Sequence, residues 1–377
     1  MRILVISDLP QFVTGGAEVQ ASRLIESWLG LGHEITVLGR RMRGREVLLA
    51  GRQVQVRRIR TLDSAGRALR ALTYALSLAR LLLIHRHRTD VVYTRFLGEG
   101  AATVALLKSL GLLHAPLVST PANTRGAGDV TFLKSIPGSS KIIGLLDRHC
   151  DAINLIAGGM DQELRDAGFS GRNFTTIPNG IPVSMPRSAV LGERRVFLCV
   201  GRLARQKGYD VLIRAVARDP EALSAGQIRI IGDGPERDTL VALAQSLSVD
   251  HIFTWLGEAD QVAVRAELEA ASVFLLPSRY EGMSNAGLEA LERGLPLIIS
   301  RCGGLDSYIN SQIGWVVAPE KVDDLSLALK SALAAAPDDL VSMSRAARAL
   351  VEDTFDMAVV GRRYEGLFQA LLEGRQA

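Results

Sequence analysis

Two glutamates eight positions apart, Glu281 and Glu289, have the chemistry and the spacing to hold a polar ligand from two sides. The apolar run 273–276 before them is typical of a buried parallel strand. Ser284 and Asn285 are favoured N-cap residues, so a helix is predicted to begin at this point. Glu281 would then lie in the loop, and Glu289 in the second turn of the helix.

A strand that ends beside the start of a helix favours an anionic ligand, because free backbone N–H groups and the positive end of the helix dipole lie there. With a carboxylate on each side, this position suits a ligand with phosphate in its middle and hydroxyl groups at both ends. Sugar nucleotides have this layout.

Cations follow a second predicted strand. The segment 201–208 comes directly after the apolar run 196–200, and it contains Arg202 and Lys207. Both could hold a diphosphate and neutralise it as it leaves. A basic loop without a ligand is the alternative interpretation. Gly234, after the next strand, permits a tight turn and fits either a ligand loop or a plain connector.

A glycine pair, Gly15 and Gly16, follows the first predicted strand and opens the first helix. It would let backbone approach a ligand closely, although such pairs are also common in ordinary turns. The segment is not Gly-x-Gly-x-x-Gly, and the second strand ends in Gly39-Arg40-Arg41 without the acidic residue that binds an NAD ribose. A dinucleotide site is therefore disfavoured, and no Walker A motif is present.

The length of 377 residues allows two domains with full cores. The three cysteines, Cys150, Cys199 and Cys302, are too few and too scattered for a disulfide framework or a zinc site, and they favour a reducing compartment. The start of the chain is predicted as a strand rather than a signal peptide. No transmembrane helix is expected, because the apolar stretch 71–84 is short of a span and contains Arg80.

Charge is distributed unevenly along the chain. Residues 1–185 carry 23 Lys and Arg against 14 Asp and Glu, a net +9, and the remainder carries a net −5. Segment 40–70 holds ten arginines against only Glu46 and Asp63. This segment is either a solvated face or a surface attracted to anionic phospholipid or to a phosphate-bearing acceptor. Nucleic acid is not expected, since no aromatic residues are interleaved with the arginines.

The apolar, arginine-flanked segment 69–84 adds support for membrane contact, with a core-facing helix as its alternative.

Short apolar strands alternate with amphipathic helices in both halves, which predicts an α/β fold with two parallel sheets. Strands are predicted at 3–7, 35–38, 54–57, 91–94, 117–119 and 152–156, and again at 196–200, 227–231, 252–255, 273–276, 297–299 and 314–317. Helices are predicted at 17–31, 66–84, 98–110, 139–150, 286–293, 340–351 and 357–373. The Pro- and Gly-rich segment 177–187 is the expected hinge.

The predicted domains are residues 1–185 and 186–355, with a final helical segment, 356–377, that packs back towards the first domain. Two such halves leave a cleft between facing strand ends, where a ligand should bind.

Five motifs occur in the order and spacing of a known family. They are Gly15-Gly16-Ala17-Glu18, Pro178-Asn179-Gly180-Ile181, Gly201-Arg202-Leu203 with Lys207-Gly208, Gly232-Asp233-Gly234-Pro235, and Glu281 with Glu289. Over nearly its whole length the chain resembles the retaining glycosyltransferases of family 4 (group 1), which have the GT-B fold. The resemblance implies an N-terminal acceptor-side domain and a C-terminal nucleotide-sugar-binding domain, both Rossmann-like, with parallel sheets facing a central cleft.

The resemblance also implies roles for individual residues. Arg202 and Lys207 would bind the donor diphosphate, Glu281 the donor sugar, and Glu289 the nucleotide ribose. The remaining donor-binding residues would be Gly15, Gly16, Gly234, Gly282, Met283, Ser284 and Asn285. Arg202, Lys207 and Glu281 would be catalytic, with the leaving diphosphate helping to deprotonate the acceptor. No metal and no cofactor are implied, because the nucleotide sugar is a substrate.

One departure concerns the acceptor side. The family usually carries a His shortly after the strand that here reads 116–120, but this chain continues 121–126 without one, and His114 precedes the strand. Asn123 or Arg125 are the candidates to supply the missing contact.

The sequence thus predicts a cytoplasmic hexosyltransferase of polysaccharide biosynthesis, peripheral on the inner face of a membrane through segment 40–70. It would move sugar from a nucleoside diphosphate donor, expected to be a UDP-sugar, to a hydroxyl of a glycan, a lipid-linked or a small-molecule acceptor. Two alternatives remain: a GT-B sugar-nucleotide epimerase, and a sugar-nucleotide-binding protein with weak or no catalysis, which the missing His motivates.

Overall fold

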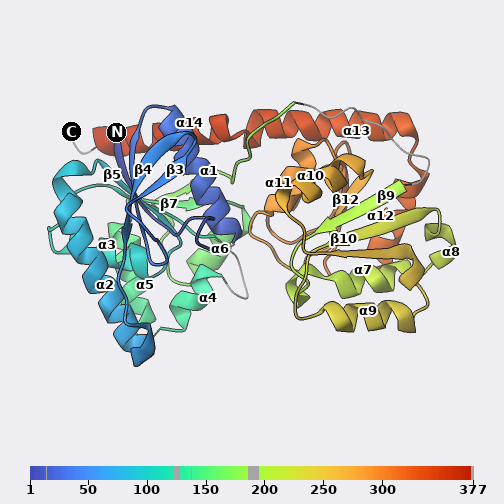
Figure 1. Ribbon diagram of the computed structural model, residues 1–377, viewed down its shortest axis with the longest axis horizontal. Helices are drawn as coiled ribbons and strands as arrows, with labels where there is room; N and C mark the ends of the chain where they lie inside the picture. Colours follow the sequence, from blue (N-terminus) through green and yellow to red (C-terminus); the bar gives the residue numbers. More distant parts are fainter. Residues whose placement is uncertain (14, 123–127, 137, 186–194, 375–377) are drawn as a thin grey trace. The chain divides into compact units, whose positions relative to one another are not determined.

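The computed structural model describes residues 1–374 except residue 14, residues 123–127, residue 137 and residues 186–194. The chain divides into two compact units: unit 1, Met1–Pro182 with Met357–Ala377, and unit 2, Val183–Asp356 (Figure 1). The boundaries predicted from the sequence lie after residues 185 and 355. Ser184 belongs to unit 2 because its backbone N–H and its hydroxyl both donate to Glu292 Oε1, at 2.9 Å. Met357 belongs to unit 1, where its N–H donates to the Ile181 carbonyl at 2.9 Å.

Unit 1 is built on an eight-stranded sheet in the order β3-β4-β2-β1-β5-β6-β7-β8. All neighbouring strands are parallel except β3 and β4. Four of the five residues of β1 and all five of β5 are buried, as expected for strands covered on both faces. The strands are β1 Arg2–Ile6, β2 Glu34–Gly39, β3 Glu46–Leu49, β4 Arg52–Arg58, β5 Val91–Arg95, β6 Leu117–Thr120, β7 Ala152–Leu155 and β8 Phe174–Thr176.

The antiparallel hairpin of β3 and β4 was not predicted. Its turn residues, Ala50 and Gly51, have φ of 47° and 73°, the left-handed conformation that a two-residue hairpin requires. Ala is an unusual residue there, so the local sequence carries a weak turn signal. The short edge strand β8 was missed as well, because only three residues form it.

The helices of unit 1 include α14, the last helix of the chain. Gly361 on α14 lies against α1, since a Cβ on it would come within 2.0 Å of Ser27 Oγ. Trp28 makes edge contacts with Tyr364 and Phe368 of the same helix, so α14 completes the core of this unit. The helices are α1 Gly16–Gly30, η1 Asp63–Ala65, α2 Gly66–His85, η2 Arg86–Arg88, α3 Glu99–Ser109, α4 Asp129–Lys134, α5 Ser139–His149, α6 Gly159–Asp166 and α14 Met357–Glu373.

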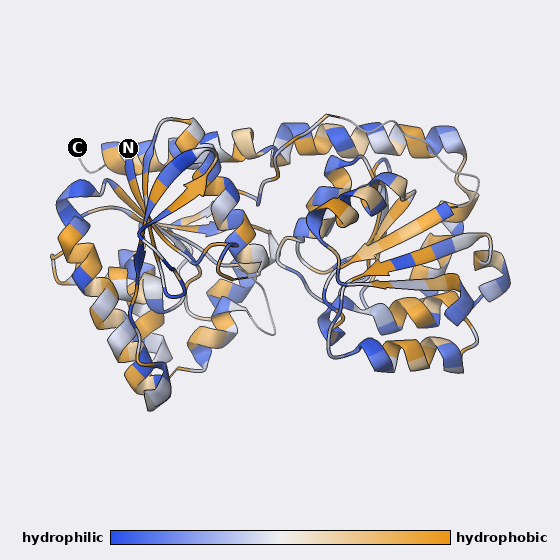
Figure 2. Ribbon diagram, viewed as in Figure 1, coloured by the Kyte–Doolittle hydropathy of each residue, from blue (hydrophilic) through white to orange (hydrophobic). Residues whose placement is uncertain are grey.

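Helix α2 matches its predicted bounds, 66–84, to within one residue. Together with η2 it forms a continuous 23-residue segment, Gly66–Arg88, which by length and composition alone could cross a membrane. The expectation of no transmembrane helix rested on the apolar stretch 71–84 and did not include η2. In this structure α2 packs on unit 1, with Leu78 and Leu82 buried, although little of the segment is covered. Hydrophobic residues recur along it (Figure 2).

Unit 2 contains a six-stranded, fully parallel sheet in the order β11-β10-β9-β12-β13-β14. Strand order reverses at β9 and β12, and the loops that follow these two strands therefore diverge to opposite faces of the sheet and leave room for a ligand. The strands are β9 Arg195–Val200, β10 Gly226–Ile231, β11 Phe253–Gly257, β12 Val273–Leu276, β13 Leu297–Ser300 and β14 Gly314–Val317.

Helices cover this sheet and enclose a second hydrophobic core. They are η3 Arg205–Lys207, α7 Tyr209–Val216, α8 Pro220–Leu223, α9 Arg237–Ser246, η4 Asp250–Ile252, α10 Gln261–Ala270, α11 Asn285–Glu292, η5 Leu305–Tyr308, α12 Val322–Ala334, α13 Pro337–Leu350 and the π-helical turn η6 Val351–Phe355.

Arg279 ties the loop after β12 to the segment after β9. Its guanidinium donates two hydrogen bonds to the Asp210 carboxylate, both 2.8 Å long, and one to Glu320 at 2.7 Å. A further bond of 2.7 Å reaches the Arg205 carbonyl. Planar two-point pairing of this kind fixes orientation as well as adding energy. The Arg279 guanidinium holds the pKa of Asp210 below its usual value, against the opposing effect of burial.

The Asp210→Asn variant tests this link. We expect it to lower the free energy of unfolding at pH 7 by about 1 kcal/mol, the scale of a partly exposed charged hydrogen bond. Because the folded-state pKa of Asp210 is depressed, its contribution is fully present above the unfolded value of about 3.9 and is lost as pH falls through the folded value.

Urea unfolding of both proteins between neutral pH and the acid limit of folding measures the effect. The difference between wild type and variant should stay constant near neutrality and shrink at acid pH. A difference that persists unchanged in acid would contradict the assignment.

Candidate functional site

The predicted site residues of unit 2 gather at one edge of its sheet. Arg202 and Lys207 follow β9, Gly234 follows β10, and Glu281 follows β12. These three strands are neighbours in the sheet and are parallel, so their carboxyl ends meet at the same edge.

The loops after β9, β10 and β12 pack with their backbones in direct contact. The Leu203 N–H donates to the Asp233 carbonyl at 2.9 Å, and a Cβ on Gly234 would lie 2.4 Å from the Leu203 carbonyl oxygen. Gly208 has φ +67°, and a Cβ there would lie 2.1 Å from the Pro277 oxygen. Only glycine fits at either position, which gives these two motif residues a structural reason of their own.

An ion pair joins two of the predicted site residues, Lys207 and Glu281. The Lys207 ammonium contacts Glu281 Oε1, and Glu281 is only 7% exposed. The Ser278 hydroxyl donates to the same oxygen at 3.0 Å. Gln206, beside Lys207, donates to the Tyr280 carbonyl at 3.0 Å. The sequence placed Lys207 and Glu281 at one site but did not foresee that they pair.

The start of α11 has the predicted form. Ser284 is its N-cap, and the Gly287 N–H donates to the Ser284 hydroxyl at 3.2 Å. Gly282 and Met283 are buried just before the helix. Asn285 is the first helical residue, and Glu289, half-buried, lies in the second turn. The cap fixes the direction in which the first N–H groups and the helix dipole point.

Arg202 lies in a different environment from Lys207. Its side chain is exposed, and it forms no ion pair with any residue in the described part of the chain. Arg279, which sequence reasoning did not single out, is the residue that positions the loop carrying Glu281. Its position next to a motif was the only signal in the sequence that could have identified it.

In unit 1, Gly15 and Gly16 open α1. Gly15 is the N-cap in an extended conformation, and a Cβ on it would lie 2.1 Å from Glu18 Oε2. His114 is exposed. The predicted acceptor-side residues Asn123 and Arg125 lie outside the described residues, so their role stays a prediction.

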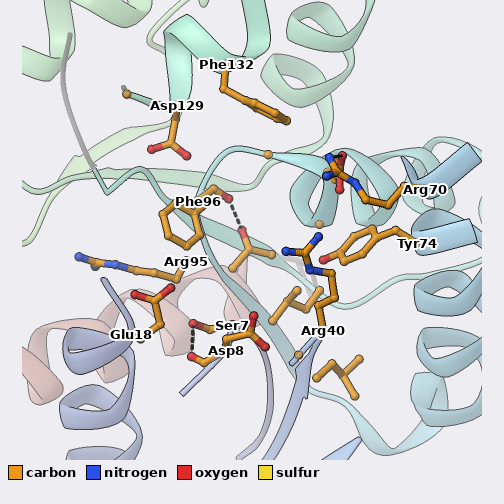
Figure 3. A pocket seen from close by; sticks show the side chains of 18 residues that line it. Ser7, Asp8, Glu18, Arg40, Arg70, Tyr74, Arg95, Phe96, Asp129 and Phe132 are labelled. Atoms are coloured by element: carbon orange, nitrogen blue, oxygen red, sulfur yellow. Dashed lines mark hydrogen bonds and ion pairs between the residues drawn. The ribbon is translucent and has the colours of Figure 1, made fainter. Parts of the chain in front are cut away.

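A pocket of about 430 Å³ lies in unit 1 where β1, β2 and β5 end (Figure 3). Acidic and basic side chains line it together with aromatic rings, which is a typical composition for a site that binds a polar ligand. The charged lining residues are Asp8, Glu18, Arg40, Arg70, Arg95, Glu99 and Asp129, and the aromatic ones are Tyr74, Phe96 and Phe132.

Two of the carboxylates in the pocket are bound to backbone. Asp129 accepts from the N–H groups of Leu97 at 2.9 Å and Ala122 at 2.8 Å, and Asp8 accepts from the Arg41 N–H at 2.8 Å. Burial raises the pKa of Glu18, and the nearby Asp8 carboxylate adds to the rise. Asp129 and Asp8 therefore shape the pocket, whereas the Glu18 carboxylate, with its raised pKa, takes up a proton more readily than an ordinary glutamate.

Arg95 is a buried cation in the pocket wall, 2% exposed. Its Nη2 donates to Asn179 Oδ1 at 2.9 Å, whereas Nε and Nη1 have no hydrogen-bond partner among the described residues. The Asn of the Pro178-Asn179-Gly180 motif thus orients an arginine of the pocket. The following residue, Phe96, has φ +112°, an uncommon conformation for a side-chain-bearing residue. Sequence reasoning missed both residues.

Two family profiles match nearly the whole chain. The profile "Glycosyl transferase 4-like domain" matches residues 15–180, and "Glycosyl transferases group 1" matches residues 183–350. The two ranges end and begin at the boundary between units 1 and 2.

Curated relatives agree with this assignment. Glycogen synthase of Mycobacterium tuberculosis is 28% identical over 406 aligned positions, covering 100% of this chain and 96% of that protein. The putative colanic acid biosynthesis glycosyltransferase WcaL of Escherichia coli is 30% identical, covering 75% of this chain and 71% of that protein.

Solved structures with the same fold cover the chain from end to end. Sucrose-phosphate synthase from Thermosynechococcus elongatus matches with a TM-score of 0.80 at 19% identity, covering 99% of both chains. Anabaena HepE in complex with UDP-glucose matches with a TM-score of 0.76 at 16% identity, covering 98% of this chain and 100% of that one. The chain is a glycosyltransferase with the GT-B fold and belongs to the group 1 glycosyltransferases of family 4 type.

Proposed function

We propose that this protein is a retaining, metal-independent hexosyltransferase that uses a UDP-sugar and transfers its sugar to a hydroxyl of a glycan, lipid-linked or small-molecule acceptor. The observation that carries the proposal is the Lys207–Glu281 ion pair at the carboxyl ends of β9 and β12. It places a cation and a carboxylate together where a ligand with charged and hydroxyl-rich parts would bind.

The roles of the residues follow from their chemistry. Lys207 and Arg202 bind the donor diphosphate and stabilise the charge that develops as it leaves. Glu281 accepts hydrogen bonds from donor-sugar hydroxyls, and Glu289 accepts from the ribose. Gly282, Met283, Ser284 and Asn285 support the donor through backbone at the start of α11, and Gly234 keeps the neighbouring loop close.

In unit 1, Gly15 and Gly16 have no side chain that would keep a phosphate away from the start of α1. The pocket lined by Glu18 and Arg95 receives the acceptor. No metal is assigned a step, because the departing diphosphate, held by cations, assists deprotonation of the acceptor on the same face.

The choice of donor draws on relatives of known ligand. HepE was solved with UDP-glucose, and starch synthase IV of Arabidopsis with ADP and acarbose. A relative from Mycolicibacterium smegmatis, 32% identical over 50% of this chain, is named as GDP-mannose-dependent. Several bases thus occur among similar proteins, and UDP is our choice from the Glu-Gly-Met-Ser-Asn segment at 281–285.

We place the protein in the cytoplasm, in peripheral contact with anionic membrane through segment 40–70. The arginines of that segment are mostly exposed on loops and on the β3–β4 hairpin, which supports electrostatic attraction to such a surface.

A thermal-shift screen against UDP-, GDP- and ADP-hexoses tests the donor. Ligand at one hundred times its Kd stabilises the folded state by about 2.7 kcal/mol, so UDP-sugars should raise Tm clearly. Stabilisation by GDP- or ADP-sugars alone would overturn the choice of base. Conversion of a UDP-sugar to its epimer without acceptor would favour the epimerase alternative, and binding without turnover across an acceptor panel would favour a binding protein.

The Glu289→Ala variant should weaken UDP binding about tenfold, since a ribose hydroxyl pair loses a charged acceptor. Isothermal calorimetry measures the effect. Glu221→Ala is the matched control, because Glu221 is exposed on α8, which precedes β10 and so lies away from the carboxyl edge of the sheet. Equal UDP affinity in wild type and Glu289→Ala would remove the ribose role.

The Lys207→Met variant should lower kcat about 10²- to 10³-fold, because the leaving diphosphate loses a positioned cation. Lys321→Met is the control of the same residue type, exposed at the start of α12. Circular dichroism checks that loss of the ion pair to Glu281 has not unfolded unit 2. Near-normal turnover by a folded Lys207→Met protein would refute the assignment.

A further inference from the structure

Helix α2 presents different chemistry on two of its faces. Arg70 and Tyr74, one turn apart, line the pocket of unit 1. Leu69, Leu72 and Leu76, spaced by three and four residues, form a ridge on another face and are 42%, 53% and 63% exposed. A helix on the surface of a water-soluble domain normally carries polar residues there. One helix therefore joins a polar pocket to an exposed apolar ridge.

At one end of the pocket two guanidiniums have few partners. Arg40 Nη1 lies 3.9 Å from Asp63 Oδ1, and Arg70 Nη2 lies 3.7 Å from Glu99 Oε1, both beyond hydrogen-bond length. Arg70 Nε is buried and has no hydrogen-bond partner in the part of the chain that the structure describes. Figure 3 shows both arginines beside Tyr74, with Glu18, Arg95 and Asp129 at the other end.

Tyr74 adds a neutral donor to the two cations. Burial raises the pKa of its hydroxyl, with Glu99 and Asp8 adding to the rise and Arg40 opposing it, so Tyr74 keeps its proton at any physiological pH. Two planar guanidiniums and a phenol match the several oxygens of a phosphate group. The nearby carboxylates of Asp63 and Glu99 are the counter-charges that such a phosphate would displace.

The ridge favours a bilayer as the source of that phosphate. Ile84, near the end of the helix, is 59% exposed as well. Exposed arginines flank and interrupt the apolar residues, at positions 67, 80, 86 and 88. A helix that lies in a membrane interface typically inserts its leucines into the boundary of the acyl chains, while its arginines contact anionic headgroups.

Resting on the proposed function, we propose that the acceptor is a lipid-linked sugar phosphate: Arg40, Arg70 and Tyr74 bind its phosphate, and the leucine ridge of α2 holds the protein at the bilayer that contains it. The sugar then lies towards the end of the pocket with Glu18 and Asp129, where carboxylates can accept from its hydroxyls. In this proposal, segment 40–70 and the apolar stretch after it both serve to bind a lipid-linked acceptor at the membrane.

The phosphate arm of the test uses farnesyl diphosphate and inorganic pyrophosphate as probes, titrated into the full chain in saturating UDP to block the proposed donor site. Farnesyl diphosphate should bind, and Arg40→Gln and Arg70→Gln should each weaken it about tenfold. Arg43→Gln, an exposed arginine outside the pocket lining, is the control. UDP affinity, measured separately, should not change in these variants. A failure of UDP binding would count against the donor proposal and not against this one.

The membrane arm measures sedimentation with vesicles of phosphatidylcholine alone and of phosphatidylcholine mixed with phosphatidylglycerol. Wild type should bind the mixed vesicles, and Leu72→Ser/Leu76→Ser should lose about tenfold or more of that binding while retaining pyrophosphate affinity. Leu327→Ser is the control, since Leu327 on α12 is also 63% exposed.

If Arg40→Gln and Arg70→Gln bind farnesyl diphosphate with the same affinity as wild type, the proposed phosphate site is wrong. The lipid assignment would be overturned by two results together: pyrophosphate binds as tightly as farnesyl diphosphate, and Leu72→Ser/Leu76→Ser binds vesicles as well as wild type does. These results would point to a soluble phosphorylated acceptor.

Discussion

The ion pair between Lys207 and Glu281 is the interaction around which the loops of unit 2 are arranged. Each residue follows a different strand, and Glu281 is nearly buried. A charge removed from water at this depth is stable only with a partner, so the loops after β9 and β12 are held in one arrangement. In the proposed donor complex the diphosphate would compete with Glu281 for the Lys207 ammonium. Hydroxyl groups of the donor sugar would then supply hydrogen bonds to Glu281, whose nearly buried carboxylate would otherwise lose its cation without compensation.

The two units differ in how completely the polar side chains around their sites are hydrogen-bonded. In unit 2 the side chains around the ion pair are fully engaged: Ser278 donates to Glu281, and Arg279 makes four hydrogen bonds to Asp210, Glu320 and the Arg205 carbonyl. In unit 1 the pocket has donors on Arg95 and Arg70 that no described residue satisfies. Buried donors without partners are costly in a folded protein, and they are tolerated where a ligand completes them. Binding in unit 1 is thus expected to increase stability more per contact than binding in unit 2.

Much of this arrangement could be predicted from local sequence. Strands β12 and β14 and helix α14 have the predicted bounds, and α11 is displaced by one residue, because apolar runs, N-caps and strand length are short-range properties. The motif residues of unit 2 meet for the same reason, since loops after neighbouring parallel strands share an edge.

What could not be predicted depends on contacts far apart in the chain. Lys207 and Glu281 are 74 positions apart, and Arg95 and Asn179 are 84 apart, so no local pattern reveals either pair. The hairpin turn has Ala50 at the position where Asn, Asp or Gly is usual. Helix α2 was predicted to within one residue, but the short helix η2 that follows it was not, so the length of the combined segment Gly66–Arg88 was missed. Asn123 and Arg125 stay predictions.

The glycines of unit 2 also bear on how the protein can change over evolutionary time. At Gly208 and Gly234 the space for a Cβ is already taken by backbone of the adjoining loop, so a substitution there disturbs two loops at once. The pocket of unit 1 is lined by side chains such as Arg40, Tyr74 and Phe132, which can be exchanged singly. Under the proposed function, single substitutions in unit 1 could therefore change the acceptor while leaving the loops of unit 2 intact, so that acceptor choice and donor binding could vary independently.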